Sequence, residues 1–261
     1  MSRPIRQFSA PCFLCLCVSL LALGPVLAVA DDAGPAAGPI RVALFRDKGV
    51  SKSVSGLAAL LRSWPELKVN EVKAAEIRSG KLAEFDVVIF PGGGASNEAS
   101  ALEEEGRKQV KSFVERGGGY LGICAGAYLA SADYEWSLHI LDAKVLDRAH
   151  WKRGTGDVEV GLSDAGRKLL AAKGDRETIY YHQGPLLAPA GKPEIPDYET
   201  LGIFETEIAK NGAPPGVMKG TTAIAAAPFG QGRVFCFSPH PEKTDAVKGQ
   251  VLKAIQWAAK R

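Results

Sequence analysis

The order of apolar and polar positions divides the chain, from residue 40 onward, into short strands alternating with helices. Apolar runs of strand length occupy 40–45, 67–72 and 87–90, whereas segments 53–63 and 98–116 place apolar residues at helical spacing. The run 87–90 is apolar throughout, as in a parallel strand that is buried on both faces. This rhythm predicts an α/β fold whose central sheet is mainly parallel, with helices on both faces.

The second half of the chain is richer in strands. A hairpin-like turn, Phe229 to Arg233, and a Pro- and Gly-rich surface loop over 188–197 interrupt it. The pattern predicts a closing helix over 243–259 and strands over 138–146, 157–161, 178–181, 201–205, 223–227 and 233–237. No internal repeat or second domain boundary is visible, so we expect one domain over residues 40–261.

Residues 1–30 have the pattern of a secretory signal peptide, which is removed on export. Arg3 and Arg6 form a positive start, an apolar run covers 13–23, and Ala28-Val29-Ala30 is a small-x-small cleavage site. We therefore expect an exported protein, periplasmic or extracellular, with a flexible leader over 31–39.

The apolar run at 13–23 is too short and wrongly flanked for a transmembrane helix. A retained N-terminal anchor is the alternative, but no other stretch could span a bilayer, so we expect no stable membrane insertion after cleavage. The cysteines at the start of the run and within it, Cys12, Cys15 and Cys17, lack the small residues expected before a lipidated cysteine, which disfavours a lipoprotein.

Charge is nearly balanced after cleavage. Loss of residues 1–30 removes two of the 32 Lys and Arg and none of the 29 Asp and Glu. Without a basic stripe or an acidic tail, we expect no nucleic-acid partner and no charged interaction arm, but a small-molecule or peptide substrate. The remaining chain, about 230 residues, suffices for one sizeable core. The oligomeric state is left open.

The most informative residue is Cys124, in the turn Gly122-Ile123-Cys124-Ala125-Gly126. The apolar run 119–123 leads into it, and we expect a helix from Ala125. Small residues two before and two after a nucleophile let a strand turn sharply into a helix, which lifts the side chain out of the backbone and points N–H groups at the reacting atom. The alternative is a buried core cysteine on a tight turn.

A histidine and a carboxylate that could serve this thiol follow the last predicted strand. His240 and Glu242 stand in Ser238-Pro239-His240-Pro241-Glu242. Thiol, imidazole and carboxylate are the parts of a nucleophilic triad. Because sites in parallel sheets lie at the carboxyl ends of the strands, we expect these groups to meet beside Pro91-Gly92-Gly93-Gly94, which ends another strand. The alternative for His240 and Glu242 is a solvated loop with two common polar residues.

Cys124 and Cys236 are the cysteines that remain after cleavage, so a disulfide between them is an alternative in an exported protein. Cys236 precedes His240 by four residues in a strand-like run, and an extended chain covers about 13 Å over that length. If His240 touches Cys124, then Cys236 is too far away to bridge it. We expect Cys236 to behave as a small buried hydrophobe.

At these motifs the chain resembles the class I glutamine amidotransferase-like superfamily, over about residues 40 to 259. The resemblance rests on Phe90-Pro91-Gly92-Gly93-Gly94, Gly122-Ile123-Cys124-Ala125-Gly126 and His240-Pro241-Glu242. Within the superfamily, the chain is similar to the branch named after the N-terminal domain of biotin–protein ligases, through residues 122–131 and Tyr180-Tyr181-His182-Gln183-Gly184-Pro185. The resemblance implies a flavodoxin-like sandwich.

The same resemblance implies a catalytic triad made of the nucleophile Cys124, the base His240 and its orienting partner Glu242. It places the oxyanion hole at the backbone N–H of Ala125 and at one N–H from Gly93 or Gly94. A free thiol is mostly protonated at neutral pH, and a neighbouring imidazole and a helix N-terminus both favour the thiolate. The expected chemistry is hydrolysis of an amide, peptide or related acyl bond through a thioester.

Two features depart from the amidotransferase pattern. Amidotransferases pass ammonia to a synthase domain, which this sequence does not show, and the predicted export removes the chain from cytosolic biosynthesis. We therefore do not expect glutamine-dependent amidotransfer, and without a ligase domain the branch name implies no biotinylation. The second hypothesis is a non-catalytic module that keeps the fold and the pocket to bind a ligand.

Further candidates for a substrate cleft lie near the motifs. His182 and Gln183 end a predicted strand in an aromatic-polar cluster, and Tyr128 and Glu135 follow the elbow. For His182, a role in stabilising the turn before Pro185 is as good a hypothesis as a role in the cleft. No pair of His, Cys or Asp has metal-ligand spacing, and the three-glycine loop lacks the Gly-Lys-Ser/Thr of a phosphate loop, so we expect no metal site and no cofactor.

Overall fold

Within residues 38–261, the part of the chain that the computed structural model describes, eleven strands form one mixed sheet. The predicted signal peptide and most of the leader lie outside the described residues. Five neighbouring strands run parallel, in the order β2-β1-β3-β4-β11. Their bounds are β1 Ile40–Phe45, β2 Leu67–Val72, β3 Val87–Phe90, β4 Gly119–Ile123 and β11 Gly232–Phe237.

An antiparallel extension continues the sheet beyond β11, in the order β10-β9-β6-β7. A side branch is formed by β8, which pairs with both β10 and β5. The bounds are β5 Ala143–Leu146, β6 Thr155–Leu162, β7 Arg176–His182, β8 Leu186–Pro189, β9 Glu199–Phe204 and β10 Thr222–Phe229. The predicted hairpin turn joins β10 to β11, with Gly230 in a left-handed conformation (φ +57°) that suits glycine.

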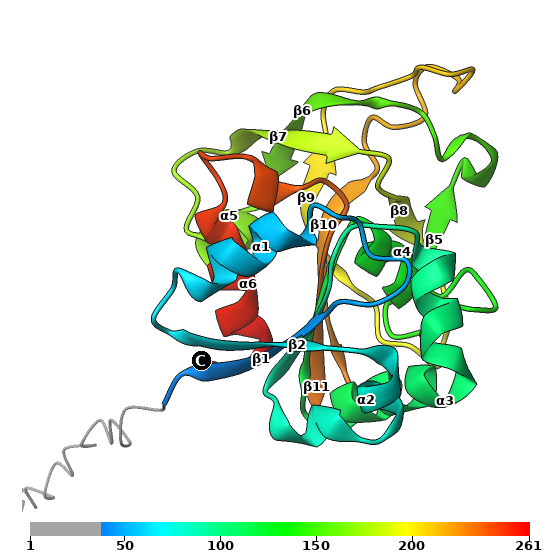
Figure 1. Ribbon diagram of the computed structural model, residues 1–261. Coiled ribbons are helices and arrows are strands. Elements are labelled where there is room, and N and C mark those ends of the chain that lie inside the picture. The colour runs from blue at the N-terminus through cyan, green and yellow to red at the C-terminus, as the bar shows by residue number, and fades with distance from the viewer. Residues whose placement is uncertain (1–37) are drawn as a thin grey trace, which may run out of the picture. The chain divides into compact units, whose positions relative to one another are not determined.

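Helices cover both faces of the sheet (Figure 1). One face carries α1 Val54–Arg62, α5 Asp164–Leu170 and α6 Gly249–Ala258, and the other carries α2 Ala74–Arg78, α3 Ala95–Glu115 and α4 Ala125–Ala130. Single turns of 3₁₀ helix occupy η1 Lys81–Glu84, η2 Arg148–His150 and η3 Pro241–Lys243. No helix within residues 38–261 has the length and apolar character that crossing a membrane requires.

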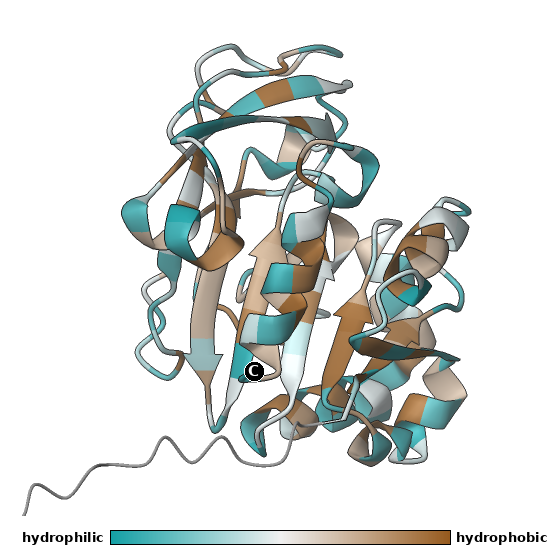
Figure 2. Cartoon of the chain, turned by 90° about the vertical axis from the view of Figure 1, so that its left-hand side faces the viewer, coloured by the Kyte–Doolittle hydropathy of each residue, from teal (hydrophilic) through white to brown (hydrophobic). Residues whose placement is uncertain are grey.

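The alternation of side chains along each strand divides the core in two. On β1, Val42 and Leu44 pack with α1 and α6, whereas Ala43 and Phe45 pack with α2 and α3. The covering helices are amphipathic, with both polar and apolar residues along each helix (Figure 2). The strands behind them are largely apolar. Burial on both faces explains why the parallel strands read as continuous apolar runs.

The predicted α/β class with a parallel central sheet is confirmed, and the first-half strands lie at the predicted positions. The predicted strand 138–146 is wrong over its first half, because β5 begins only at Ala143. Residues 138–141 are apolar for another reason: Leu138 and Ile140 are buried and donate backbone hydrogen bonds to the carbonyls of Leu129 and Ala130. Burial in irregular backbone produced the same pattern that a strand would.

Three other expectations need correction. The closing helix begins at Gly249 rather than at 243, since residues 241–243 form the separate turn η3. The loop expected over 188–197 starts inside β8, which reaches Pro189. The short helices α2 and α5 were not predicted from the apolar pattern, because segments of five and seven residues are too short to show a helical period.

Candidate active site

Three adjacent parallel strands deliver the predicted site residues to one edge of the sheet. The loop Pro91–Gly94 follows β3, Cys124 follows β4, and His240 follows β11 after two residues. Pairing of β4 with both β3 and β11 makes these three chain segments neighbours. The carboxyl ends of parallel strands are where α/β sheets place their sites.

Cys124 has a backbone conformation that few residues with a side chain adopt, with φ 53° and ψ −97°. Hydrogen bonds hold it there. Its N–H donates to the carbonyl of Phe237 (2.8 Å), and its carbonyl accepts from the N–H groups of Ala127 (3.0 Å) and Tyr128 (3.2 Å). Such strain persists only where the surroundings impose it, and it concentrates at functional sites.

The glycines on either side of Cys124 are required by close packing. A Cβ atom on Gly122 would lie 2.6 Å from the carbonyl oxygen of Gly126, and one on Gly126 would lie 2.2 Å from the carbonyl oxygen of Phe90. The strand can therefore turn into α4 within one residue only because both neighbours lack side chains. This is the sharp turn that the spacing predicts.

His240 is buried, with 3% of its surface exposed, between a carboxylate and the thiol. Its Nδ1 lies 2.7 Å from Oε1 of Glu242, whose side chain is also buried. Burial by itself lowers the pKa of His240, but hydrogen bonds to Cys124 and to Glu242 raise it to about 9. A protonated imidazole beside a cysteine favours the thiolate, which is the nucleophilic form of that side chain.

Two backbone N–H groups beside the thiol donate no hydrogen bond within the described chain: those of Gly93 and Ala125. Gly94 is different, because its N–H donates to the carbonyl of Gly49 (2.8 Å). Of the two glycines that the resemblance implies for the oxyanion hole, the structure thus leaves Gly93 with a free donor. Gly93 must also lack a side chain, since a Cβ would lie 2.2 Å from the Gly49 carbonyl oxygen.

Glu98, in the first turn of α3, lies beneath this loop. It is fully buried, and neither carboxyl oxygen has a hydrogen-bond partner within residues 38–261. Burial raises its pKa well above the ordinary value, which favours the neutral form of the carboxyl. Nothing in the sequence pattern distinguishes Glu98, since an acid in the first turn of a helix is common.

The end of β7 closes the site from the side. The side chain of His182 is exposed and lines the cleft, 6.2 Å from the ring of His240 between ring centroids, while its carbonyl lies 3.3 Å from the Cys124 sulfur and accepts from the thiol. The Gln183 carbonyl accepts from the Tyr128 hydroxyl (3.2 Å), and both residues line the cleft. Glu135, in contrast, is exposed and lies outside the cleft lining, so its assignment to the pocket is wrong.

The cleft has a volume of about 870 Å³, and the motifs supply only part of its lining. We call a second group of lining residues, which the sequence did not single out, the wall of the cleft. They share aromatic or cationic side chains and come from segments after α4, after β5 and after β11: Tyr134, Trp136, Arg148, Trp151 and Lys243. Nothing in the spacing of these residues relates them to Cys124, and only folding brings them together.

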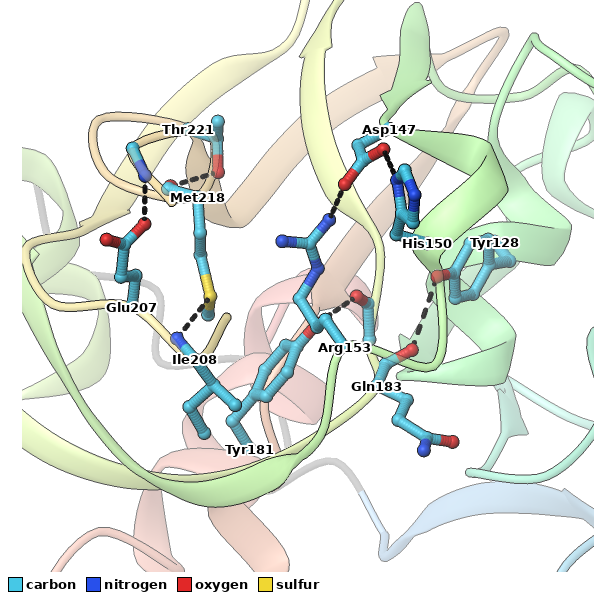
Figure 3. Close-up of polar contacts among 12 residues, drawn as sticks. Tyr128, Asp147, His150, Arg153, Tyr181, Gln183, Glu207, Ile208, Met218 and Thr221 are labelled. Carbon is cyan, nitrogen blue, oxygen red and sulfur yellow. Dashed lines mark hydrogen bonds and ion pairs between the residues drawn. The ribbon is translucent and has the colours of Figure 1, made fainter. Parts of the chain in front are cut away.

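A buried ion pair shapes the segment that carries Arg148 and Trp151. The Arg153 side chain is 2% exposed, and its Nη2 donates to Oδ2 of Asp147 (2.6 Å), while Nδ1 of His150 lies 2.5 Å from Oδ1 of the same carboxylate. Figure 3 shows Arg153 reaching toward Asp147 beside the Tyr128–Gln183 contact. Because the Asp147–Arg153 pair joins the two ends of segment 147–153, it fixes the segment in a loop that carries Arg148 and Trp151 at the cleft.

Cys236 is buried in β11 with no surface exposed, and both cysteines of the described chain are free. Burial raises the pKa of the Cys236 thiol. The two thiols therefore differ sharply in their surroundings, since Cys124 lines the cleft. Among residues 38–261, no group of three or more His, Cys, Asp or Glu side chains is placed to hold a metal ion.

Comparison with known families gives one match: residues 40–149 fit the family described as biotin-protein ligase, N terminal. The biotin–protein ligase of Schizosaccharomyces pombe is 34% identical over 62 residues, which are 24% of this chain. The chain spans about a tenth of that ligase, because the aligned part is 10% of its length.

Other relatives cover most of the chain. The imidazole glycerol phosphate synthase subunit HisH of Wolinella succinogenes is 27% identical over 216 residues, 78% of this chain and 95% of the relative. Among solved structures, PurLQS from Thermotoga maritima superposes with a TM-score of 0.60 at 17% identity, over 85% of this chain and 99% of the matched chain, a likeness of fold. The family match, the relatives and the shared fold together place this chain in the class I glutamine amidotransferase-like superfamily, with a region of biotin–protein ligase N-terminal type.

Proposed function

We propose that this protein is an exported hydrolase-like enzyme that cleaves an amide, peptide or related acyl bond through a thioester on Cys124. One observation carries the proposal: Cys124 sits on a strained turn and lines a cleft together with a buried histidine, His240, that Glu242 orients through a 2.7 Å contact. Nucleophile, base and orienting group in this order of contact are the general signature of covalent catalysis.

In the proposed reaction, His240 already holds the proton of Cys124, and the thiolate sulfur attacks the carbonyl carbon of the substrate. The electron pair displaced from the C=O bond comes to rest on oxygen, where the N–H groups of Gly93 and Ala125 stabilise it. When the pair returns, the C–N bond breaks, and the leaving amine takes the proton from His240. Water then attacks the thioester, giving one proton to His240, and the acid departs as the thiolate–imidazolium pair is restored.

The proposal is hydrolysis rather than transfer of ammonia. HisH is a synthase subunit by name, but the N-terminal pattern of this chain predicts export, away from cytosolic biosynthesis. Positive Arg3 and Arg6, the apolar run and Ala28-Val29-Ala30 support that localisation. N-terminal sequencing of the native protein should begin at or near Asp31, and a native product beginning at Ser2 would reject export.

A second candidate function is ligand binding without turnover. The observation that favours it is the contact between the Cys124 thiol and the carbonyl of His182 (3.3 Å), because a thiol that donates to a carbonyl is satisfied in its protonated form. In that case the cleft would hold a small ligand, and Cys124 would serve as one of its polar contacts.

The two functions are separated by the reactivity of the cysteines. If Cys124 is a nucleophile, iodoacetamide labels it near pH 6 much faster than Cys236, which reacts only after unfolding. Mass spectrometry of the labelled peptides measures both rates in one sample. The mature protein is then screened against amide and peptide libraries with Cys124→Ala as the control. An inert Cys124, with ligand binding retained, would support the binding module and reject the hydrolase.

A further inference from the structure

The charges that face the cleft are all of one sign. Arg148 and Lys243 line it, together with His240, and no Asp or Glu does. Burial lowers the pKa of His240, but its contacts with Cys124 and Glu242 raise it to about 9, and the Glu242 carboxylate at 2.7 Å balances its charge. The whole chain carries 32 Lys and Arg against 29 Asp and Glu, so composition does not explain this imbalance. Its cause is the arrangement of the fold.

The carboxylates nearest the cleft leave Arg148 and Lys243 available to a ligand. Arg148 has an ion pair with Asp133, but at 3.7 Å, beyond ordinary hydrogen-bond distance, and about half of its side chain stays exposed. Glu242 pairs with His240 (2.7 Å), and burial of Glu98 beneath the glycine loop raises its pKa, which favours the uncharged form. Lys243 makes no ion pair within residues 38–261. An anion entering the cleft would therefore meet two cations that no carboxylate binds at hydrogen-bond distance.

Aromatic rings hold the key cation in place. The Arg148 guanidinium lies 4.2 Å from the centre of the Tyr134 ring, and Tyr134 stacks on Trp136 with centroids 4.5 Å apart. A guanidinium stacked on a ring keeps its edge N–H groups free to grip a carboxylate through two hydrogen bonds. Trp151 stands beside it with 47% of its surface exposed, which is unusual for so large an apolar side chain.

From this wall we propose that the ligand of the cleft carries a carboxylate next to a flat ring. Arg148 binds the carboxylate, and Trp151 with the Tyr134–Trp136 stack holds the ring. This assignment rests on the proposed function, since it takes the scissile amide to lie between the Cys124 sulfur and this wall. It makes the protein selective for amides that combine an aromatic or similar planar group with a negative charge.

The test uses hippurate, an aromatic amide with a free carboxylate, and its neutral carboxamide. Both are titrated into the Cys124→Ala protein, with tryptophan fluorescence as the readout, so that neither a reactive thiol nor turnover is needed. We expect hippurate to bind about tenfold more tightly than the carboxamide, and salt to reduce the difference. Arg148→Gln on the same background should abolish the preference.

Controls separate the Arg148 contact from net charge and from folding. Lys253→Gln removes one positive charge from the exposed side of α6 and should retain the preference. Arg148→Lys keeps the positive charge but loses the planar guanidinium group. Its preference for hippurate over the carboxamide should therefore lie between that of the protein with Arg148 and that of Arg148→Gln. Equal affinity for the two probes, no binding of either, or a preference that survives Arg148→Gln would overturn the proposal. Because the assay needs no thiol, its result is independent of the reactivity of Cys124. Hippurate binding can fail although Cys124 proves to be a nucleophile, and hippurate can bind although Cys124 proves to be inert.

Discussion

The parallel and antiparallel parts of the sheet contribute different things to the cleft. The parallel strands β3, β4 and β11 end together and supply the glycine loop, Cys124 and His240, the last two at buried positions. The antiparallel part supplies β7 and the segments around β5, which carry exposed or half-exposed side chains such as His182, Arg148 and Trp151. In the proposed function, the parallel part supplies the reaction geometry and the antiparallel part supplies contact with a ligand.

This difference shows that the fold places the proposed reacting groups and the proposed ligand-contacting side chains on different parts of the sheet. Reacting atoms need placement within a fraction of an ångström, which buried strand ends provide. A binding wall can vary as long as its charge and shape suit the ligand, so loops suffice for it. If this division holds, changes at the parallel edge should alter thiol chemistry, and changes at the wall should alter binding alone.

The largest expected effect concerns the charge pair at the parallel edge. The pKa of His240 is raised from its ordinary 6.5 to about 9, so the folded state holds the proton more tightly than the unfolded state. The resulting stability is complete below pH 6.5 and is lost as pH rises to 9, up to about 3 kcal/mol in the free energy of unfolding. Glu242→Gln should flatten this decline.

Urea unfolding at several pH values between 6 and 9 measures the decline in both proteins. Ionisation of the unfolded thiols is common to both and cancels in the comparison. Parallel curves for wild type and Glu242→Gln would show that Glu242 does not hold the imidazolium.

The next effect compares the two histidines. His240→Ala should slow alkylation of Cys124 by iodoacetamide about 100-fold at pH 6, because an ordinary thiol is almost fully protonated there. His182→Ala should leave that rate within about twofold, since its exposed ring serves the wall, but it should weaken ligand binding. Equal alkylation rates in wild type and His240→Ala would reject His240 as the activating base. If His182→Ala binds the ligand normally, His182 does not serve the cleft, and its role is to stabilise the turn before Pro185.

A smaller effect distinguishes two neighbouring glycines. A Cβ on Gly92 would lie 2.7 Å from Cε1 of His240, a ring that Glu242 prevents from moving, whereas a Cβ on Gly94 would meet only the flexible Asn97 side chain at 3.0 Å. Gly92→Ala should therefore slow alkylation of Cys124 about tenfold, and Gly94→Ala by less than about twofold. Similar rates in the two variants would show that the ring position matters little to the thiol.

The smallest effect is expected at the wall. Trp151→Ala removes a half-exposed ring, so the free energy of unfolding should change by less than about 0.5 kcal/mol and labelling of Cys124 by iodoacetamide should not change. Hippurate affinity should fall in the same variant. Thermal melts, labelling rates and titrations on one preparation check all three. A large change in the labelling rate of Cys124 would mean that the wall and the thiol are coupled. The two parts of the sheet would then not have separate roles.

The sequence alone determined the parallel core of this protein and the sharp turn that carries Cys124. Continuous apolar runs identify strands buried on both faces, and the glycines around Cys124 mark a turn that tolerates no side chain, so both follow from local rules. The same rules misread residues 138–141, where burial in irregular backbone imitates a strand.

Only the tertiary structure decided which residues face the thiol across the cleft and which backbone donors remain free. Arg148 and Trp151 reach the cleft because the buried Asp147–Arg153 pair shapes their segment, and Gly94 differs from Gly93 only through a hydrogen bond to Gly49. Neither contact has a signature in sequence spacing. Long-range packing places these groups, and it depends on how every element of the sheet is filled.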